Sequence, residues 1–172
     1  MVSGNISSSY ELSYDQHCAS NSVPEIILTT AGCNPNNQDG NCADKTSTIY
    51  TSDGETFANI PPMPVALSRT CVVALDKNDL FVTGGSYIND EGCGDESDKS
   101  YLYRSDTNEW EELPGLLTTR DDHMCARVHN SNGEEEVVVA GGFSCGCGPE
   151  DCLGEIDLVD IYNLQSGEWR KG

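Results

Sequence analysis

Basic residues are scarce in this 172-residue chain. Nine Lys and Arg stand against 29 Asp and Glu, which gives a formal net charge of −20. Nucleic-acid phosphates and anionic membranes are recognised through Lys and Arg, so both are poor partners for this surface. A basic protein or a cation is electrostatically allowed, and a solvated acidic surface is the simplest interpretation.

Long apolar runs and recognisable catalytic motifs are also missing. The longest uninterrupted apolar run is far shorter than a membrane span, and no apolar segment near Met1 reads as a signal peptide. No window shows a helical apolar period over about 11 residues, which predicts almost no helix. The sequence contains no Gly-x-Ser-x-Gly, phosphate-loop or His-Glu-x-x-His motif. These observations predict neither an enzyme nor a bound cofactor or metal.

A pattern of glycines and aromatic residues occurs three times. A short apolar run ends in Gly, a polar loop follows, and a Tyr comes 18, 18 and 20 residues after the last Gly. An aromatic residue always stands 7 positions after that Tyr. Such a long period indicates a repeat architecture. The repeat residues are Gly32, Tyr50 and Phe57, then Gly84, Gly85, Tyr103 and Trp110, then Gly141, Gly142, Tyr162 and Trp169.

Each unit divides into four short segments of strand character. They are rich in β-branched and apolar residues, and residues such as Asp and Asn mark the turns between them. We therefore predict an all-β chain of four-stranded antiparallel blades that bury their faces against one another. The expected strands are 70–75, 80–83, 100–103 and 109–113 in the second unit, and 125–129, 137–140, 158–162 and 168 onward in the third.

These features resemble kelch repeat proteins. The double glycines, the tyrosines and the tryptophans carry the resemblance, and Arg69, Arg120 and Leu113-Pro114 also fit it. The first unit departs from the pattern, because Ala31-Gly32 replaces the glycine pair and Phe57 replaces Trp. The resemblance implies a kelch-type β-propeller in which the Gly, Tyr and Trp residues serve blade packing.

The repeat also divides the chain. We expect a polar tail or a remnant of a preceding blade over 1–15, a degenerate blade over 16–63, a blade over 64–114 and a C-terminally truncated blade over 115–172. A propeller needs about 4–8 blades to close. We therefore expect these residues to be a fragment of a larger propeller, with the remaining blades as the nearest partners.

The nine cysteines form two classes. Cys18, Cys71 and Cys125 stand at matching places before the glycines of their units, in the expected first strands. The resemblance places that strand beside the central channel. We interpret the three as buried packing residues and not as a disulfide set, since equivalent positions in neighbouring blades are expected to be too far apart to bridge.

The other six cysteines fall in the loops between the second and third strands of the units. Candidate pairs are Cys33 with Cys42, and Cys145 or Cys147 with Cys152, which leaves Cys93 for the remaining thiol. The connectivity stays open. Stapled loops indicate an oxidising compartment, and Asn5 in Asn-Ile-Ser is a candidate glycosylation site. We predict an extracellular or secreted location, with a cytoplasmic one as the alternative.

Metal sites are the competing interpretation of these loops. Zinc held by Cys93, Cys145, Cys147 and Cys152 lacks the usual paired spacing. Calcium held by the acidic loop 90–98 lacks an EF-hand pattern. His17 and His123 each stand just before a cysteine of their unit, which suggests equivalent rim positions, and His129 is the third histidine.

Fold alone does not establish function. We predict a protein-interaction or scaffold module, part of a secreted or ectodomain propeller with stapled loops and an unknown protein partner. One alternative is an intracellular kelch adaptor of the ubiquitin-ligase substrate-receptor type. A second is a fragment of a galactose-oxidase-like copper enzyme, an activity that the kelch superfamily includes but whose His, Tyr and Cys–Tyr ligands have no local match here.

Overall fold

The computed structural model describes residues 26–30, 47–51, 57–89, 94–146 and 152–172, with side chains from residue 60 onward outside those gaps. These residues form β-strands and one short 3-10 turn, Asp76–Asn78. The prediction of an all-β chain is confirmed. None of the described segments contains a helix long and apolar enough to cross a membrane.

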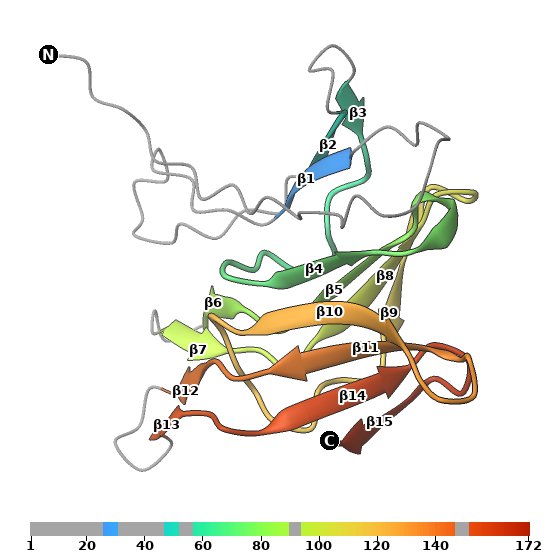
Figure 1. The fold of residues 1–172 in the computed structure, drawn as a ribbon. Coiled ribbons are helices and arrows are strands. Elements are labelled where there is room, and N and C mark those ends of the chain that lie inside the picture. The colour runs from blue at the N-terminus through green and yellow to red at the C-terminus, as the bar shows by residue number, and fades with distance from the viewer. Residues whose placement is uncertain (1–25, 31–46, 52–56, 90–93, 147–151) are drawn as a thin grey trace, which may run out of the picture.

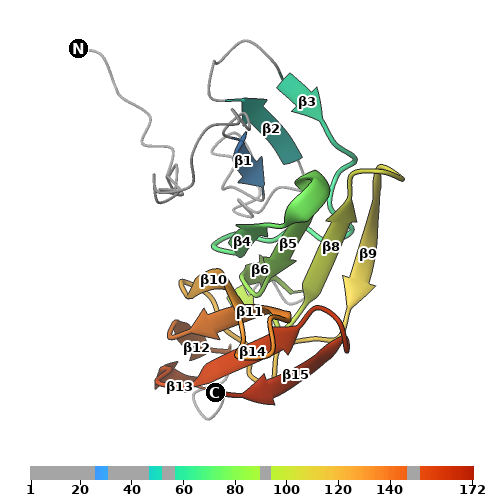
Figure 2. The same ribbon diagram turned by 45° about the vertical axis from the view of Figure 1, so that its right-hand side comes forward.

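Two four-stranded antiparallel sheets make up the main body (Figure 1), as the sequence predicts. Blade II comprises, in spatial order, β4 (Cys71–Ala74), β5 (Leu80–Thr83), β8 (Ser100–Arg104) and β9 (Glu109–Leu113). Blade III comprises β10 (Met124–His129), β11 (Glu135–Ala140), β14 (Val159–Asn163) and β15 (Glu168–Lys171). Figure 2 shows the two sheets stacked one above the other.

A three-stranded sheet precedes them, in the part of the chain assigned to the degenerate unit. Its strands are β1 (Ile26–Thr30), β2 (Ser47–Thr51) and β3 (Phe57–Asn59), in that order. The segment around Cys18, where a fourth strand was expected, lies outside the described residues.

The constant spacing from Tyr to the next aromatic residue follows from the register of the hairpin that the two residues share. Seven positions place the two residues directly opposite each other on neighbouring strands: Tyr50 faces Phe57, Tyr103 faces Trp110 and Tyr162 faces Trp169. In blades II and III the ring centroids lie 5.4 and 5.0 Å apart. Aromatic pairs across an antiparallel sheet stabilise it beyond their buried area.

Both tryptophans also attach their blade to the segment that leads into it from the preceding unit. The indole Nε1 of Trp110 donates a hydrogen bond of 2.8 Å to the carbonyl of Pro61, and that of Trp169 donates one of 2.8 Å to Pro114. A buried Trp usually satisfies its N–H in this way.

A single apolar cluster joins blade II to blade III. Phe81 is fully buried and its ring lies 5.3 Å from Tyr162 and 6.1 Å from Trp169. Val73 and Val137 belong to the same cluster. A second cluster, with Val82 and Tyr101, lies on the other side of blade II. Because successive residues of a strand point to opposite faces, neighbours such as Phe81 and Val82 serve different interfaces.

The expectation that Cys71 and Cys125 are unbonded packing residues is wrong. They form a disulfide between β4 and β10, with Cα atoms 5.9 Å apart. The register explains it. Cys71 lies opposite Thr83, next to Gly84, whereas Cys125 lies opposite Val139, two residues before Gly141. This offset of one residue turns the two side chains toward opposite faces of their own sheets, and so toward each other.

Replacing both cysteines, in Cys71→Ala/Cys125→Ala, should lower the free energy of unfolding by about 4 kcal/mol, because the crosslink spans 54 residues. Urea unfolding followed by Trp fluorescence measures this. Cys145→Ala/Cys152→Ala is the matched control, since its crosslink spans only 7 residues and should contribute about 2 kcal/mol. Equal losses in the two variants would contradict a blade-to-blade crosslink.

Candidate functional site

Several segments outside the four-stranded sheets gather at the edge of blades II and III that follows the double glycines, here called the loop edge. It comprises the linker 114–123 and two small hairpins, which lie together in Figure 1. The hairpin strands are β6 (Ser86–Ile88) with β7 (Gly94–Glu96), and β12 (Phe143–Cys145) with β13 (Cys152–Glu155).

The double glycines position this edge. Gly85 and Gly142 have φ of 105° and 101°, a region that residues with a Cβ rarely adopt. A Cβ at Gly85 would lie 2.5 Å from the carbonyl oxygen of Ser68, and one at Gly142 would lie 2.5 Å from that of Asp121. Because glycine has no Cβ, the linker that enters each blade can pair with the strand directly after the double glycine. The pairs are the bridges Ser68 to Ser86 and Asp121 to Phe143.

A buried ion pair fixes the linker into blade III. Arg120 is fully buried, and its Nη2 donates a 2.9 Å hydrogen bond to Oδ2 of Asp160 on β14. Its Nη1 donates to the carbonyls of Gly141 and Leu158, both at 3.0 Å. Burial lowers the pKa of the Arg120 guanidinium, and Asp160 opposes that shift. The group still carries its charge at neutral pH.

Blade II has an apolar pair at the same place. The bridges to Ser86 and Phe143, each just after a double glycine, align Leu67 with Arg120. The registers Val82 to Tyr101 and Val139 to Asp160 align Tyr101 with Asp160. Leu67 and Tyr101 are both buried in one apolar cluster. Blade III has therefore exchanged an apolar contact for an ion pair.

Arg69 and Arg120 both precede a first strand but are not equivalent. Arg69 aligns with Asp122, and both residues adopt a left-handed φ, of 56° and 50°. The Arg69 side chain is exposed, and its Nη1 lies 3.1 Å from Oδ2 of Asp121. Burial raises the pKa of the Asp121 carboxyl, and Arg69 opposes that shift.

His123 is buried beside this cluster. Its Nε2 lies 3.1 Å from the Thr83 carbonyl, to which it donates as a neutral imidazole. Burial, and secondarily the charge of Arg120, lowers the pKa of His123 to about 4. His129 lies at the far end of β10, where Nε2 is 3.6 Å from Glu135. The structure therefore does not bring these two histidines together, and His17 lies outside the described residues.

Cys145 and Cys152 form a disulfide across β12 and β13, with Cα atoms 3.8 Å apart. Of the acidic residues considered for calcium, Asp95 and Glu96 lie on β7 and Asp98 follows it. Across the described segments, no group of three or more His, Cys, Asp and Glu side chains is arranged to hold a metal. The remaining predicted positions, Cys33, Cys42, Cys93, Cys147, Asn5, Asp90 and Glu91, lie outside the described residues.

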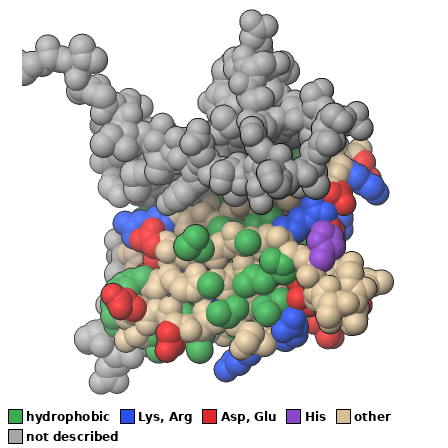
Figure 3. Space-filling view, in the orientation of Figure 1, with side chains coloured by type: hydrophobic (Ala, Val, Ile, Leu, Met, Phe, Trp, Pro, Cys, Tyr) green, Lys and Arg blue, Asp and Glu red, His purple; other side chains and the backbone are tan. Residues whose placement is uncertain are grey.

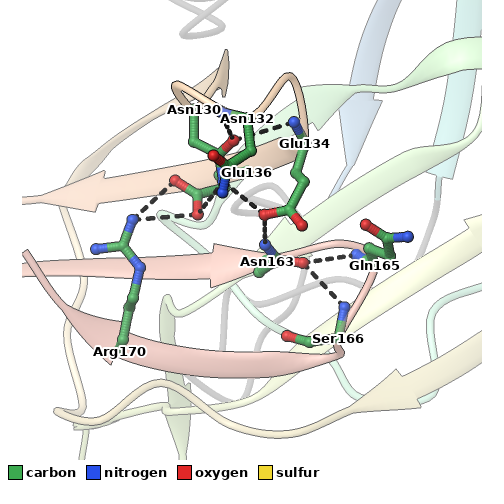
Figure 4. Close-up of polar contacts among 8 residues, drawn as sticks. All are labelled: Asn130, Asn132, Glu134, Glu136, Asn163, Gln165, Ser166 and Arg170. Atoms are coloured by element: carbon green, nitrogen blue, oxygen red, sulfur yellow. Dashed lines mark hydrogen bonds and ion pairs between the residues drawn. The ribbon is translucent and has the colours of Figure 1, made fainter.

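The opposite edge carries a polar network and a cavity of about 350 Å³. Figure 4 shows Arg170 on β15 reaching Glu136 on β11, with Nη2 2.9 and 3.1 Å from the carboxylate oxygens. Asn130 and Asn163 both donate to Glu134, at 2.7 and 3.2 Å. Burial acts to raise the pKa of Glu136, but hydrogen bonds from Arg170 and Asn130 outweigh it and lower that pKa.

Blade II contains the same kind of network, which favours a structural interpretation. Asp79, the residue before Leu80, occupies the place of Glu136, the residue before Val137. Its carboxylate accepts from Arg104 at 3.3 Å and from the Ser105 amide at 2.8 Å. In both blades a carboxylate therefore ties two neighbouring strands and their turns together.

One face of blade III is exposed and apolar. Figure 3 shows hydrophobic side chains gathered over β10, β11 and β14. Met124 is 78% exposed and Val128 is 36% exposed. Met124, next to Ala140 in register, corresponds to Cys71 of blade II, whose equivalent face is covered by blade III. This face therefore has the character of a blade-to-blade packing surface.

Sequence reasoning missed the Arg120–Asp160 pair. A signal for it is present in the chain. The signal appears when the second and third units are aligned on their double glycines, and not on their cysteines or arginines. Arg120 and Asp160 of the third unit then align with Leu67 and Tyr101 of the second.

Arg120→Leu should lower the free energy of unfolding by about 3–5 kcal/mol, because it leaves Asp160 charged and buried without its partner. Arg120→Leu/Asp160→Tyr, which recreates the blade II pair, should recover most of that loss. Chemical denaturation measures both. A double variant no more stable than the single one would contradict the equivalence of the two positions.

The stability of the protein should fall by about 2–3 kcal/mol as the pH is lowered from about 6.5 toward 4. In the folded protein the pKa of His123 is lowered to about 4, so over this range the unfolded chain binds a proton at this residue that the folded chain does not. His123→Gln should flatten this pH dependence, measured as the denaturation midpoint at each pH. His129→Gln, at an exposed position, serves as control and should behave as the unsubstituted protein does.

Comparison with known proteins supports the blade architecture. No protein-family profile matches the chain. It is 27% identical over 114 residues to Kelch-like protein terF of Aspergillus terreus, covering 66% of this chain and 24% of that protein. It is 27% identical over 137 residues to human Kelch repeat and BTB domain-containing protein 12, covering 77% of this chain and 20% of that protein. The chain thus spans between a fifth and a quarter of these relatives.

The fold is similar to a solved structure described as "Structure of YjhT", with a TM-score of 0.66 and 15% identity, covering 87% of this chain and 47% of that one. That match concerns the fold alone. The stacked four-stranded blades, the double glycines and the opposed Tyr–Trp pairs have the architecture of a kelch-type β-propeller, and in sequence the chain is similar to kelch repeat proteins.

Proposed function

We propose that this chain is the binding part of a protein-interaction propeller, in which rigid blades present the loop edge to a protein partner. The observation that carries the proposal is the pair of hairpins, β6–β7 and β12–β13. Both stand outside the four-stranded sheets and are not needed to complete a blade. Loops held on a rigid scaffold are where binding residues concentrate.

The two disulfides support a secreted or ectodomain setting, since such bonds persist in oxidising compartments. The name of the human relative, which includes a BTB domain, supports the intracellular adaptor as the alternative. In either setting the module acts by binding and not by catalysis.

A photo-crosslinking residue at position 155 of the natural full-length protein in cells should yield covalent adducts with a partner protein. Glu155 is exposed on β13 of the loop edge. The same residue placed at Asp106, in the turn between β8 and β9, is the control. Mass spectrometry of the adducts identifies the partner. Adducts from position 106 alone, or none from either, would contradict the proposal.

Thiol trapping separates the two settings. In the secreted setting, rapid alkylation of the protein in its native compartment should leave Cys71 and Cys125 unmodified until a reductant is added. Alkylation of both cysteines without reduction would favour the intracellular adaptor.

A further inference from the structure

One face of blade III is a continuous apolar surface (Figure 3). Ala126, Val138 and Ile161 lie directly opposite one another across β10, β11 and β14, so they share a face of the sheet. Met124 and Val128 stand two positions before and after Ala126 on β10, and the alternation of side chains places them on that face too. These five residues define what is here called the open face.

In blade II the equivalent row is buried by the next blade. Val73, Phe81 and Leu102 occupy the matching register positions and are 5%, 0% and 3% exposed. Tyr162 and Trp169 of blade III cover this row, with ring centroids 5.3 and 6.1 Å from that of Phe81. In blade III the matching three residues are half-buried or exposed. The open face is therefore the same kind of surface without its neighbour.

The two ends of the stack carry complementary patterns. Inside the chain, the Tyr162–Trp169 pair packs on Phe81 of the preceding blade. In the first unit, Tyr50 and Phe57 hold the corresponding places, opposite each other on β2 and β3. The first unit thus has the pattern that covers a preceding blade, and blade III has the row that such a pattern covers.

The number of units also leaves room for a second set. A propeller closes with about 4–8 blades, and these residues supply three units, two four-stranded blades and the sheet β1–β3. The solved structure of similar fold is matched over 47% of its length by 87% of this chain. A second set of three units is therefore about what a ring of that size still needs. Identical head-to-tail contacts close into a ring when the rotation between copies allows it.

We propose that two copies of this chain assemble head to tail into one six-bladed ring, in which the open face of each copy packs against the first unit of the other. Three units from each copy give the six blades. Rotation about the central channel keeps both loop edges on the same side of the ring. The assembly thus adds to the proposed interaction function, because it presents two identical binding edges to a partner.

The charge of the chain opposes this association but does not concentrate on the open face. Each copy carries a net charge of −20. On the face itself, the carboxylate of Glu136 is paired with Arg170 at 2.9 Å, and Glu168 lies at the margin, opposite Asn163. Screening at physiological salt limits repulsion between distant carboxylates to about 8 Å. Higher salt should therefore strengthen an apolar contact between two copies.

Sedimentation of the purified 172-residue chain over a range of concentrations tests the assembly. We expect a species of twice the chain mass that grows no further as the concentration rises, because a closed ring has no free face. Its dissociation constant should fall as salt is raised from about 0.05 to 0.5 M. A monomer at all concentrations would overturn the proposal and assign the open face to further blades of a longer polypeptide. Open-ended growth, or a dimer that weakens with salt, would also overturn it.

Variants locate the contact. Met124→Glu places a charge at a site that is 78% exposed in the single chain, and should weaken the dimer by at least about tenfold, since both interfaces of the ring then bury the charge. Met124→Lys should weaken it too, although it lowers the net charge. Thr107→Glu, exposed in the turn between β8 and β9, adds the same negative charge and should change the affinity by less than about twofold. Equal effects of Met124→Glu and Thr107→Glu would overturn the proposal, and thermal unfolding checks that each variant is folded.

Crosslinking distinguishes the ring from a face-to-face dimer. A diazirine analogue of methionine at position 124, in a mixture of isotopically labelled and unlabelled copies, should form adducts with the first unit of the other copy, residues 16–63. Adducts with residues 124–129 of the other copy would indicate two open faces in contact and would overturn the ring. These experiments contain no other protein, so their failure leaves the interaction function in place. A ring that yields no partner crosslinked at position 155 contradicts that function alone.

Discussion

Burial of one sheet face against the next is the constraint on which the rest of this structure depends. A four-stranded sheet cannot cover its own faces, so each blade requires a neighbour. Between blades II and III that requirement is met by Phe81 packing on Tyr162 and Trp169. The indoles of Trp110 and Trp169 add a hydrogen bond to the carbonyl of the proline before their blade, so blades II and III are each attached to the segment that leads into them.

The strict alternation of side chains along a strand decides which residues meet across that interface. A shift of one position relative to the double glycine turns Cys125 to the face opposite to that used by Cys71, and the disulfide becomes possible. Arg120 and Asp160 replace an apolar pair within the same frame. Their charges are tolerated because the guanidinium reaches two backbone carbonyls as well as the carboxylate.

The constraints loosen at the loop edge. The double glycines hold the base of each hairpin, and beyond that point the two hairpins contact each other through β7 and β12. Phe143 and Leu153 are exposed there, and the Cys145–Cys152 disulfide links β12 to β13. The opposite edge also carries charged groups, but there the carboxylates of Glu136 and Asp79 accept hydrogen bonds that link neighbouring strands and turns.

The division into four-stranded blades is readable from the sequence. Two spacings, from Gly to Tyr and from Tyr to the next aromatic, predict four antiparallel strands, because a hairpin register leaves a fixed count between residues that face each other. Which face of its sheet each side chain points to is visible only in the folded blades. Cys71 and Cys125 look equivalent when residues are counted back from the glycines, but that count includes the turn between the first two strands as well as their register. Side chains alternate between the faces of a strand, so a shift of one residue moves a cysteine to the opposite face. The same holds for Arg120, whose partner Asp160 stands 40 residues away, so the two meet only because the linker folds against β14 of blade III.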